Sequence, residues 1–327
     1  MMRSEPNPDL LAGVLNSISQ FRGKTRLADL LGRLTLSFKG SRGTFLLASG
    51  ETVTIDLGDR IQRLMWGGAY EPHVRRCFVA LLRPGDTCVD VGAHIGFFST
   101  IASSLVGPSG KVYAFEANST LLQPLRSNAS QFPWMVASLR AVCDKSGSVA
   151  FSNPQLDGES GWGKLASVRN EGHIESVEAV SLDEWHESVG SPLIRLIKID
   201  AEGSEPFILE GARRVIANSR PYLIIELNDE LLRAVRRTRE SVTDSLREQG
   251  YGIFAIGLND LDESSDLIDP MFAEILCVPS DRLEETMSLL PMPRGKHRSG
   301  GRTHHISCKE LRSYCTTFCK TIMKQAI

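Results

Sequence analysis

The sequence carries no excess of basic charge, and this absence argues against one large class of function. It has 37 lysine and arginine residues against 39 aspartate and glutamate residues, a formal net charge of −2. A general nucleic-acid-binding protein shows a basic excess or a basic stripe. The chain also lacks any run close to the roughly 20 apolar residues that a membrane helix needs. We therefore expect no nucleic-acid partner and no membrane span.

Cysteine is scarce, and its distribution does not indicate a disulfide framework. Four of the seven cysteines, Cys77, Cys88, Cys143 and Cys277, stand in separate apolar segments. Free thiols buried in a reducing compartment are the simplest explanation. The N-terminal segment before Arg22 also lacks the continuous apolar core of a secretory signal. We therefore expect a cytoplasmic protein.

A turn that follows a short apolar strand is the most informative part of the sequence. Residues 88–91 read Cys-Val-Asp-Val, and residues 92–96 interrupt this strand with two glycines before a helical pattern over 97–105. Glycine lets a ligand approach the backbone closely. A second strand over 112–116 ends in Glu116, where an acid can accept both hydroxyls of a ribose. The pattern predicts that the chain binds an adenosine-like ribose.

The turn lacks the G-x-G-x-x-G spacing on which a nicotinamide cofactor places its pyrophosphate. An acid, Asp90, stands before the first glycine instead, and such an acid repels a pyrophosphate but can hold an ammonium. S-adenosylmethionine carries an ammonium, a sulfonium and no phosphate, so the turn favours this cofactor. The candidate cofactor-binding residues from this part of the chain are Asp90, Gly92, Ala93, His94, Gly96, Glu116 and Ala117.

A second acidic block adds a family resemblance. Residues 195–205 read Arg-Leu-Ile-Lys-Ile-Asp-Ala-Glu-Gly-Ser-Glu, and Ser-Leu-Asp-Glu stands at 181–184. Together with the turn and Glu116, these motifs resemble the FkbM family of S-adenosylmethionine-dependent methyltransferases, and they stand in the family's order. The resemblance covers about residues 70–228 and continues more weakly to Pro279. Asparagine is usual in the family where this chain has His94.

The fold class expected from this pattern is α/β, because apolar strands alternate with helical segments between residues 86 and 280. The resemblance implies a doubly wound, Rossmann-like methyltransferase sheet of seven strands with a reversed last strand. We expect the strands at 87–91, 111–116, 138–143, 195–199, 221–226, 251–256 and 272–278. A loop over 152–178, rich in Gly, Ser and Asn, is expected to be a substrate lid.

We divide the chain into three parts. Residues 1–69 are expected to form N-terminal helices and a hairpin that cap the fold or cover the mouth of the active site. Residues 70–290 would be the methyltransferase domain. Residues 291–327 are a basic tail whose His and Cys spacing matches no common zinc pattern, and we expect this tail to be mobile.

Asp200 and Glu202, at the end of the fourth strand, are the candidate catalytic residues. Methyl transfer to a hydroxyl requires an aligned nucleophile and removal of its proton. Asp200 is also expected at the cofactor, whereas Glu202 could instead cap the next helix. The family positions that match Tyr70 and Glu71 often lie near the methionine end of the cofactor, with exposure on a helix as the alternative.

Two further interpretations stay open. Val142 and Asp144 end the third strand, where the adenine ring would lie, and Asp144 either accepts from the adenine amine or is a solvated acid. Asp200, Glu226 and Asn228 resemble the oxygen ligands of metal-dependent catechol-type methyltransferases. A divalent metal is possible on this pattern, but we favour a site without one.

The sequence thus favours S-adenosylmethionine-dependent methylation of a hydroxyl, and the resemblance implies that the hydroxyl belongs to a small molecule, a glycan or a polyketide-like acceptor. One alternative is a nicotinamide-dependent oxidoreductase, which the missing glycine spacing disfavours. Another is a non-catalytic cofactor-binding module, which the intact Asp90, Gly92, Gly96 and Glu116 disfavour.

Overall fold

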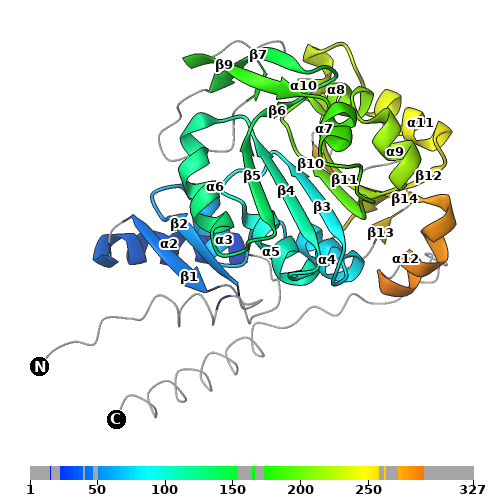
Figure 1. The fold of residues 1–327 in the computed structure, drawn as a ribbon. Helices are drawn as coiled ribbons and strands as arrows, with labels where there is room; N and C mark the ends of the chain where they lie inside the picture. The colour runs from blue at the N-terminus through cyan, green and yellow to red at the C-terminus, as the bar shows by residue number, and fades with distance from the viewer. Residues whose placement is uncertain are drawn as a thin grey trace, which may run out of the picture. The chain divides into compact units, whose positions relative to one another are not determined.

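The computed structural model describes residues 15, 23–39, 41–46, 51–153, 164–165, 173–257, 261–262 and 272–290. A mixed sheet, here called the main sheet, forms the centre of this part of the chain (Figure 1). In spatial order its strands are β13 (Leu261–Asp262), β12 (Tyr251–Ile256), β14 (Phe272–Pro279), β11 (Tyr222–Asn228), β10 (Leu196–Ile199), β3 (Thr87–Val91), β4 (Lys111–Glu116) and β5 (Met135–Leu139).

The strand directions confirm the expected doubly wound sheet with a reversed last strand. The ladders that join β11, β10, β3, β4 and β5 are all parallel. The last long strand, β14, runs antiparallel to both of its neighbours, β11 and β12. The two-residue β13 extends the edge beyond the seven expected strands.

Helices cover both faces of the main sheet (Figure 1). In chain order they are α2 (Lys24–Lys39), α3 (Arg60–Trp66), α4 (Pro72–Leu81), α5 (Phe97–Val106), η1 (Ser119–Leu121), α6 (Leu122–Ala129), α7 (Leu182–Ser188), α8 (Glu205–Glu210), α9 (Arg213–Ser219), α10 (Asp229–Ala234), α11 (Arg239–Glu248), η2 (Ser280–Arg282) and α12 (Leu283–Leu289). None of the helices in the described residues is long and apolar enough to cross a membrane.

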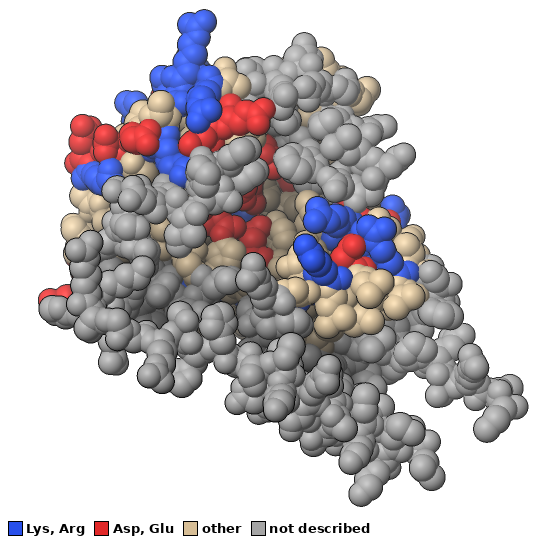
Figure 2. Space-filling view, turned by 180° about the vertical axis from the view of Figure 1, so that it is seen from behind, with Lys and Arg blue, Asp and Glu red and all other residues tan. Residues whose placement is uncertain are grey.

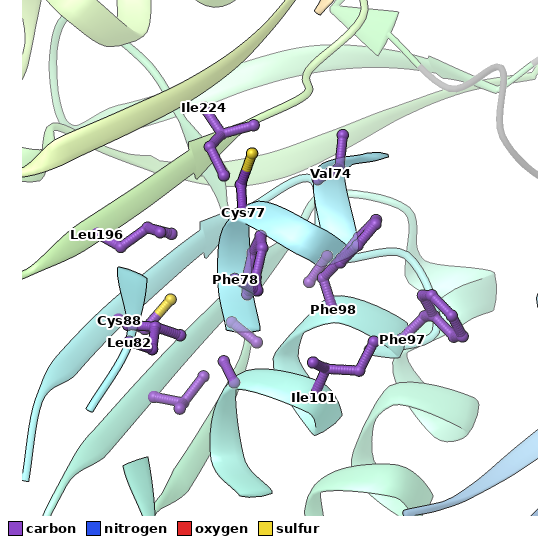
Figure 3. Packing of buried hydrophobic residues seen from close by; sticks show 14 of the residues in the cluster. Val74, Cys77, Phe78, Leu82, Cys88, Phe97, Phe98, Ile101, Leu196 and Ile224 are labelled. Carbon is purple, nitrogen blue, oxygen red and sulfur yellow. The ribbon is translucent and has the colours of Figure 1, made fainter. Parts of the chain in front are cut away.

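Alternation along β10 shows how the two faces differ. Leu196 packs with Phe78 of α4 and Phe98 of α5 in one hydrophobic cluster (Figure 3). Ile197 and Ile199 belong to the cluster on the opposite face, which α7, α8, α9 and α11 complete. Successive side chains of a strand point to opposite faces, so Lys198 lies on the α4–α5 face, as Leu196 does.

The helical pattern over 61–82 is broken in the structure. The helix α3 ends at Trp66, with Gly67 as its C-cap, and α4 begins at Pro72. Gly68 adopts a φ of +63°, and proline lacks the N–H that a continuous helix would need but suits a first helical turn. The break places Tyr70 and Glu71 in a bend rather than on a helix surface.

The expected third strand over 138–143 is wrong in its extent. The strand β5 begins earlier, at Met135, and its ladder with β4 ends at Leu139, opposite Glu116. After Arg140 the chain enters β6 (Ala141–Val142), which belongs to a second sheet, here called the side sheet. Its order is β6, β9 (His173–Val180), β7 (Gly147–Asn153) and β8 (Lys164–Leu165).

The side sheet also corrects the expected loop over 152–178. The strands β7 and β9 pair antiparallel along their whole length, so both ends of that segment are strands. The other residues of the expected lid lie outside the described residues, apart from β8. The tail over 291–327 and all but residue 15 of an expected first helix also lie outside them.

Two expectations for other segments are confirmed. The strands β1 (Arg42–Leu46) and β2 (Thr52–Asp56) form the expected antiparallel hairpin. Cys77, Cys88, Cys143 and Cys277 are buried and free.

Candidate active site

A cavity of about 250 Å³ opens at the edge of the main sheet where β3, β4 and β10 end. Residues that follow these strands line it, together with α3, the bend before α4 and the side sheet. Acidic residues are frequent in this lining, and Figure 2 shows a hollow with acidic side chains inside it. Ligands of doubly wound sheets bind at this edge, so the cavity is the candidate active site.

The turn after β3 is held by its neighbours. The backbone N–H groups of Gly92 and Ala93 both donate to the carbonyl of Phe115, at 3.0 and 2.9 Å. Gly92 has a φ of +77°, and a Cβ atom on it would lie 1.8 Å from the carbonyl oxygen of Asp200. Glycine is therefore required at this position because the turn touches the end of β10. This requirement is separate from any need for space around a ligand.

Asp90 is a buried acid with one unused oxygen. It is 1% exposed, and its Oδ2 accepts a hydrogen bond from Ser99 Oγ at 2.5 Å. Its Oδ1 has no hydrogen-bond partner among the described residues. Burial raises the pKa of this carboxyl above its ordinary value. A buried oxygen without a partner beside a cavity is suited to a ligand that donates hydrogen bonds.

Glu116 ends β4 with its carboxylate fixed by the backbone. The N–H groups of His94 and Asn118 donate to its two oxygens, each at 2.7 Å. Burial raises the pKa of Glu116 to about 7, although the two backbone donors oppose this shift. Its orientation is set by the turn itself, because His94 belongs to that turn.

A group of acids surrounds a lysine at the end of β10. Lys198 Nζ donates to Asp200 Oδ2 at 2.7 Å. Glu71 lies in the bend before α4, and burial raises its pKa to about 7, with the charge of Asp200 adding to the shift. Tyr70 is hydrogen bonded to Glu71. The charge of Asp200 and burial both raise the pKa of Glu226, on the neighbouring strand.

The three carboxylates of this group are close enough to share one cation. An oxygen of Glu71, one of Asp200 and one of Glu226 lie within 4.8 Å of one another. The expected trio contained Asn228 instead of Glu71. The Oδ1 atom of Asn228 accepts from the N–H groups of Glu230 and Leu231, at 3.0 and 3.3 Å. It caps α10, so Glu71 takes its place in the trio.

Most of the expected site residues share the cavity. Those that line it are Tyr70, Glu71, Asp90, Gly92, Ala93, His94, Glu116, Ala117, Val142, Asp200 and Glu202. Gly96 and Asp144 are not among the lining residues. A Cβ atom on Gly96 would lie 2.8 Å from Leu125 of α6, so this glycine serves helix packing. Asp144 follows β6 and lies 3.9 Å from the exposed Lys145.

No side chain caps α8, so the cap expected from Glu202 is not formed, and the acid that bonds to the turn before this helix is Glu205. Glu205 Oε1 accepts from the N–H groups of Ala201 and Gly203, at 3.1 and 3.0 Å. Glu202 adopts a φ of +48° and faces the cavity. Of the two meanings that the sequence left open for Glu202, the structure therefore favours a place in the site.

A comparison with known protein families matches the part of the chain that contains these site residues. The family model described as "Methyltransferase FkbM domain" matches residues 90–253, half of the chain. The chain belongs to the FkbM methyltransferase family. Its matched region begins at Asp90 and contains Glu116, Asp200 and Glu226.

Two curated relatives and one solved structure are similar to this FkbM protein. The hexuronic acid methyltransferase AglP of Haloferax volcanii is 29% identical over 159 residues, 48% of this chain and 62% of AglP. The 2-O-methyltransferase NoeI of Sinorhizobium fredii is 25% identical over 173 residues, 49% of this chain and 70% of NoeI. A methyltransferase FkbM from Methylobacillus flagellatus is 16% identical, with a TM-score of 0.38, over 67% of this chain and 54% of that structure.

Sequence reasoning missed two cations in the lining of this FkbM site. Lys198 was not singled out, although its place two residues before Asp200 on a strand puts both on the same face. Arg140 is the single residue between β5 of the main sheet and β6 of the side sheet. Its side chain forms an ion pair with Glu178 at 3.0 Å. No short motif marks it, because its position depends on where β5 ends.

We expect the free energy of unfolding of the ligand-free protein to fall as the pH rises from about 5 to about 8. Burial raises the pKa of Glu71, Glu116 and Glu205 to about 7 and that of Glu274 to about 8. The folded state therefore keeps protons that the unfolded carboxyls release above their ordinary pKa of about 4.3. Stability from these groups is full below that value and is lost as the pH approaches 7 to 8.

Urea denaturation at a series of pH values measures this dependence. Glu71→Gln should flatten the slope, because one of the proton-binding groups is removed. Glu284→Gln, an exposed position on α12, is the matched control and should leave the slope unchanged. A free energy that increases with pH across this range would contradict the expectation.

Proposed function

We propose that this FkbM protein transfers the methyl group of S-adenosylmethionine to a hydroxyl of a sugar. The observation that carries the proposal is the single cavity in which Asp90, Glu116 and Asp200 meet. Asp90 lies one residue before the end of β3, Glu116 ends β4 and Asp200 follows β10, so a ligand that fills the cavity would contact all three. The family to which the chain belongs supports the methyl transfer.

The residues around the turn fit the cofactor. The unpartnered oxygen of Asp90 would accept from the cofactor's ammonium, and the fixed carboxylate of Glu116 would accept from the ribose hydroxyls. Ala117 and Val142 supply apolar surface for the adenine. When bound, S-adenosylmethionine supplies a methyl group on a positively charged sulfur, which an acidic cavity favours.

Asp200 is the residue best placed to accept the proton of the hydroxyl. Methylation of a hydroxyl leaves one proton, and a general base near the reacting oxygen takes it. Asp200 lines the cavity and accepts a hydrogen bond from Lys198, which holds its carboxylate in place beside the other acids. Glu202 lines the same cavity and is the second candidate for this role.

The relatives favour a sugar as the acceptor, and the charge of the cavity bears on which kind of sugar. The relatives AglP and NoeI are described as a hexuronic acid methyltransferase and a 2-O-methyltransferase. The lining of the cavity contains six acids against two lysine or arginine side chains, both of which are paired with acids. A neutral sugar hydroxyl enters such a cavity more easily than a uronic acid, whose carboxylate the acids repel.

Methyl-labelled S-adenosylmethionine with a panel of acceptors tests the proposal. The panel contains methyl glycosides of neutral hexoses and of hexuronic acids, and the products are S-adenosylhomocysteine and a labelled sugar. We expect labelled neutral sugars and weaker or no labelling of uronic acids. Labelling confined to amines, or to nucleic acid added as a competitor, would reject a sugar hydroxyl as the acceptor.

Glu116→Gln is expected to weaken S-adenosylmethionine binding by about tenfold or more. Hydrogen bonds to a charged group contribute about 1.5–3 kcal/mol each, and 1.4 kcal/mol corresponds to a factor of ten. Isothermal titration calorimetry measures the dissociation constant. Asp144→Asn, an acid that follows a neighbouring strand outside the cavity lining, should bind as the wild type does. An unchanged constant in Glu116→Gln would remove Glu116 from the ribose site.

A further inference from the structure

Lys198 lies inside the acidic cavity, and the function proposed above does not by itself require it. The residue is 4% exposed and is paired in register with Asp90 across the β10–β3 ladder. Its Nζ lies 2.7 Å from Asp200 Oδ2 and 5.2 Å from the centre of the Phe98 ring. A buried ammonium over an aromatic ring and against a carboxylate is held in one position.

The charges around Lys198 keep it protonated. Burial alone would lower its pKa, but the carboxylates of Asp200, Asp90 and Glu71 raise the pKa of Lys198 above its ordinary value. It therefore cannot serve as the base of the reaction. The other lysine or arginine of the described lining, Arg140, pairs with Glu178 of the side sheet. Lys198 is thus the cation that faces Glu71, Asp90 and Asp200.

We propose that Lys198 is a positioning residue for methyl transfer: its ammonium holds the Asp200 carboxylate in place and supplies the counter-charge for the carboxylates beside it. The inference rests on the proposed function, in which Asp200 takes the proton of the acceptor hydroxyl. Without the ammonium, Asp200 would face Glu71 and Glu226 uncompensated. Repulsion between these carboxylates would then move the Asp200 side chain from its position, because like charges this close disfavour one another.

The positive charge of Lys198 also bears on whether the site needs a divalent ion. The oxygens of Glu71, Asp200 and Glu226 have a spacing that a metal could use. The ammonium bonded to one of them supplies positive charge at that place from the chain itself. We therefore expect turnover to be unchanged by a chelator such as EDTA, with added Mg²⁺ giving no gain.

Turnover to the labelled sugar in five variants tests the positioning role. Lys198→Met should lower kcat by about tenfold or more and change the Michaelis constant for the acceptor sugar much less. Lys198→Arg keeps the charge and should restore part of the loss. The double variant Lys198→Met/Asp200→Asn should have nearly the same turnover as Asp200→Asn alone. A residue that acts through Asp200 has no effect once that carboxylate is gone. Lys145→Met, an exposed lysine outside the lining, is the matched control.

A binding measurement tests the counter-charge without any acceptor. Sinefungin carries an amine-bearing carbon where S-adenosylmethionine has its methyl-bearing sulfur, whereas S-adenosylhomocysteine carries no charge there. In Lys198→Met the sinefungin ammonium should replace the missing cation, so the ratio of the two dissociation constants should move toward sinefungin by about tenfold. Lys198→Arg and Lys145→Met should keep the wild-type ratio.

The outcomes separate this inference from the proposed function. A shifted ratio with no methylated sugar supports the counter-charge of Lys198 and rejects a sugar hydroxyl as the acceptor. An unchanged ratio, wild-type turnover in Lys198→Met, or loss of turnover with EDTA overturns the inference even if sugars are methylated. A thermal melt shows whether Lys198→Met is folded. If it is not, the ratio of the two dissociation constants is measured in the double variant, which removes both charges, and is compared with the ratio in Asp200→Asn.

Discussion

Asp200→Asn is expected to lower the turnover of methyl transfer by about 10² to 10⁴-fold, while the dissociation constant of S-adenosylmethionine changes only a few-fold. Asparagine keeps the volume of the side chain and can still contact Lys198, but it cannot take a proton. General-base assistance contributes a factor of this size in many enzymes. Steady-state kinetics with the labelled cofactor and calorimetry on the same protein measure the two effects.

Glu202→Gln is the matched comparison for Asp200→Asn. Both acids follow β10 and line the cavity, but Lys198 bonds only to Asp200 among the contacts described. We expect the larger loss in Asp200→Asn. The reverse order would identify Glu202 as the base, and equal small losses would leave alignment of the two substrates as the main source of rate.

Gly92→Ala is expected to reduce the free energy of unfolding by about 3 kcal/mol or more. A left-handed backbone costs a residue with a Cβ atom about 1–2 kcal/mol, and overpacking adds about 1–3 kcal/mol. The added Cβ would lie 1.8 Å from the Asp200 carbonyl oxygen, a backbone atom that cannot turn away. The turn and the end of β10 would have to separate. Urea denaturation measures the loss.

Gly190→Ala separates the two contributions. This exposed glycine has a φ of +85°, close to that of Gly92, but nothing lies within 4 Å of its Cβ position. We expect a loss of only about 1–2 kcal/mol there. Similar losses in the two variants would mean that the contact between Gly92 and Asp200 contributes nothing to stability.

The positions of the strand-end acids follow from the sequence because their causes are local. Asp90, Glu116 and Asp200 each belong to or follow an apolar run, and the ends of parallel strands meet at one edge. Their presence in one cavity needs no further information. Glu71 is different, because it enters the same cavity only where two glycines and Pro72 divide a helical pattern.

Long-range pairing explains what the sequence did not reveal. The strand β5 stops where its partner β4 stops, and nothing in Arg140 itself signals a change of sheet. Likewise, it depends on the path of residues 201–203 that Glu205, and not Glu202, accepts from the backbone N–H groups of this turn. Lys198 illustrates a third case. Its spacing from Asp200 is visible in the sequence, but its role depends on the carboxylates that other segments of the fold place beside it.

The chain enters the side sheet from the main sheet and leaves the side sheet again at a neighbouring point. Ala141 and Val142 of β6 pair in register with Ala179 and Val180 of β9, so the chain departs and comes back through one small parallel ladder. A segment whose two ends lie together can be replaced without moving the points where it joins the rest of the chain. Phe151, which the side sheet contributes to the cavity, packs in one hydrophobic cluster with Phe207 of α8 and Leu231 of α10. A graft between Val142 and Val180 would therefore have to keep an apolar face toward α8 and α10 while it changes the surface that lines the cavity.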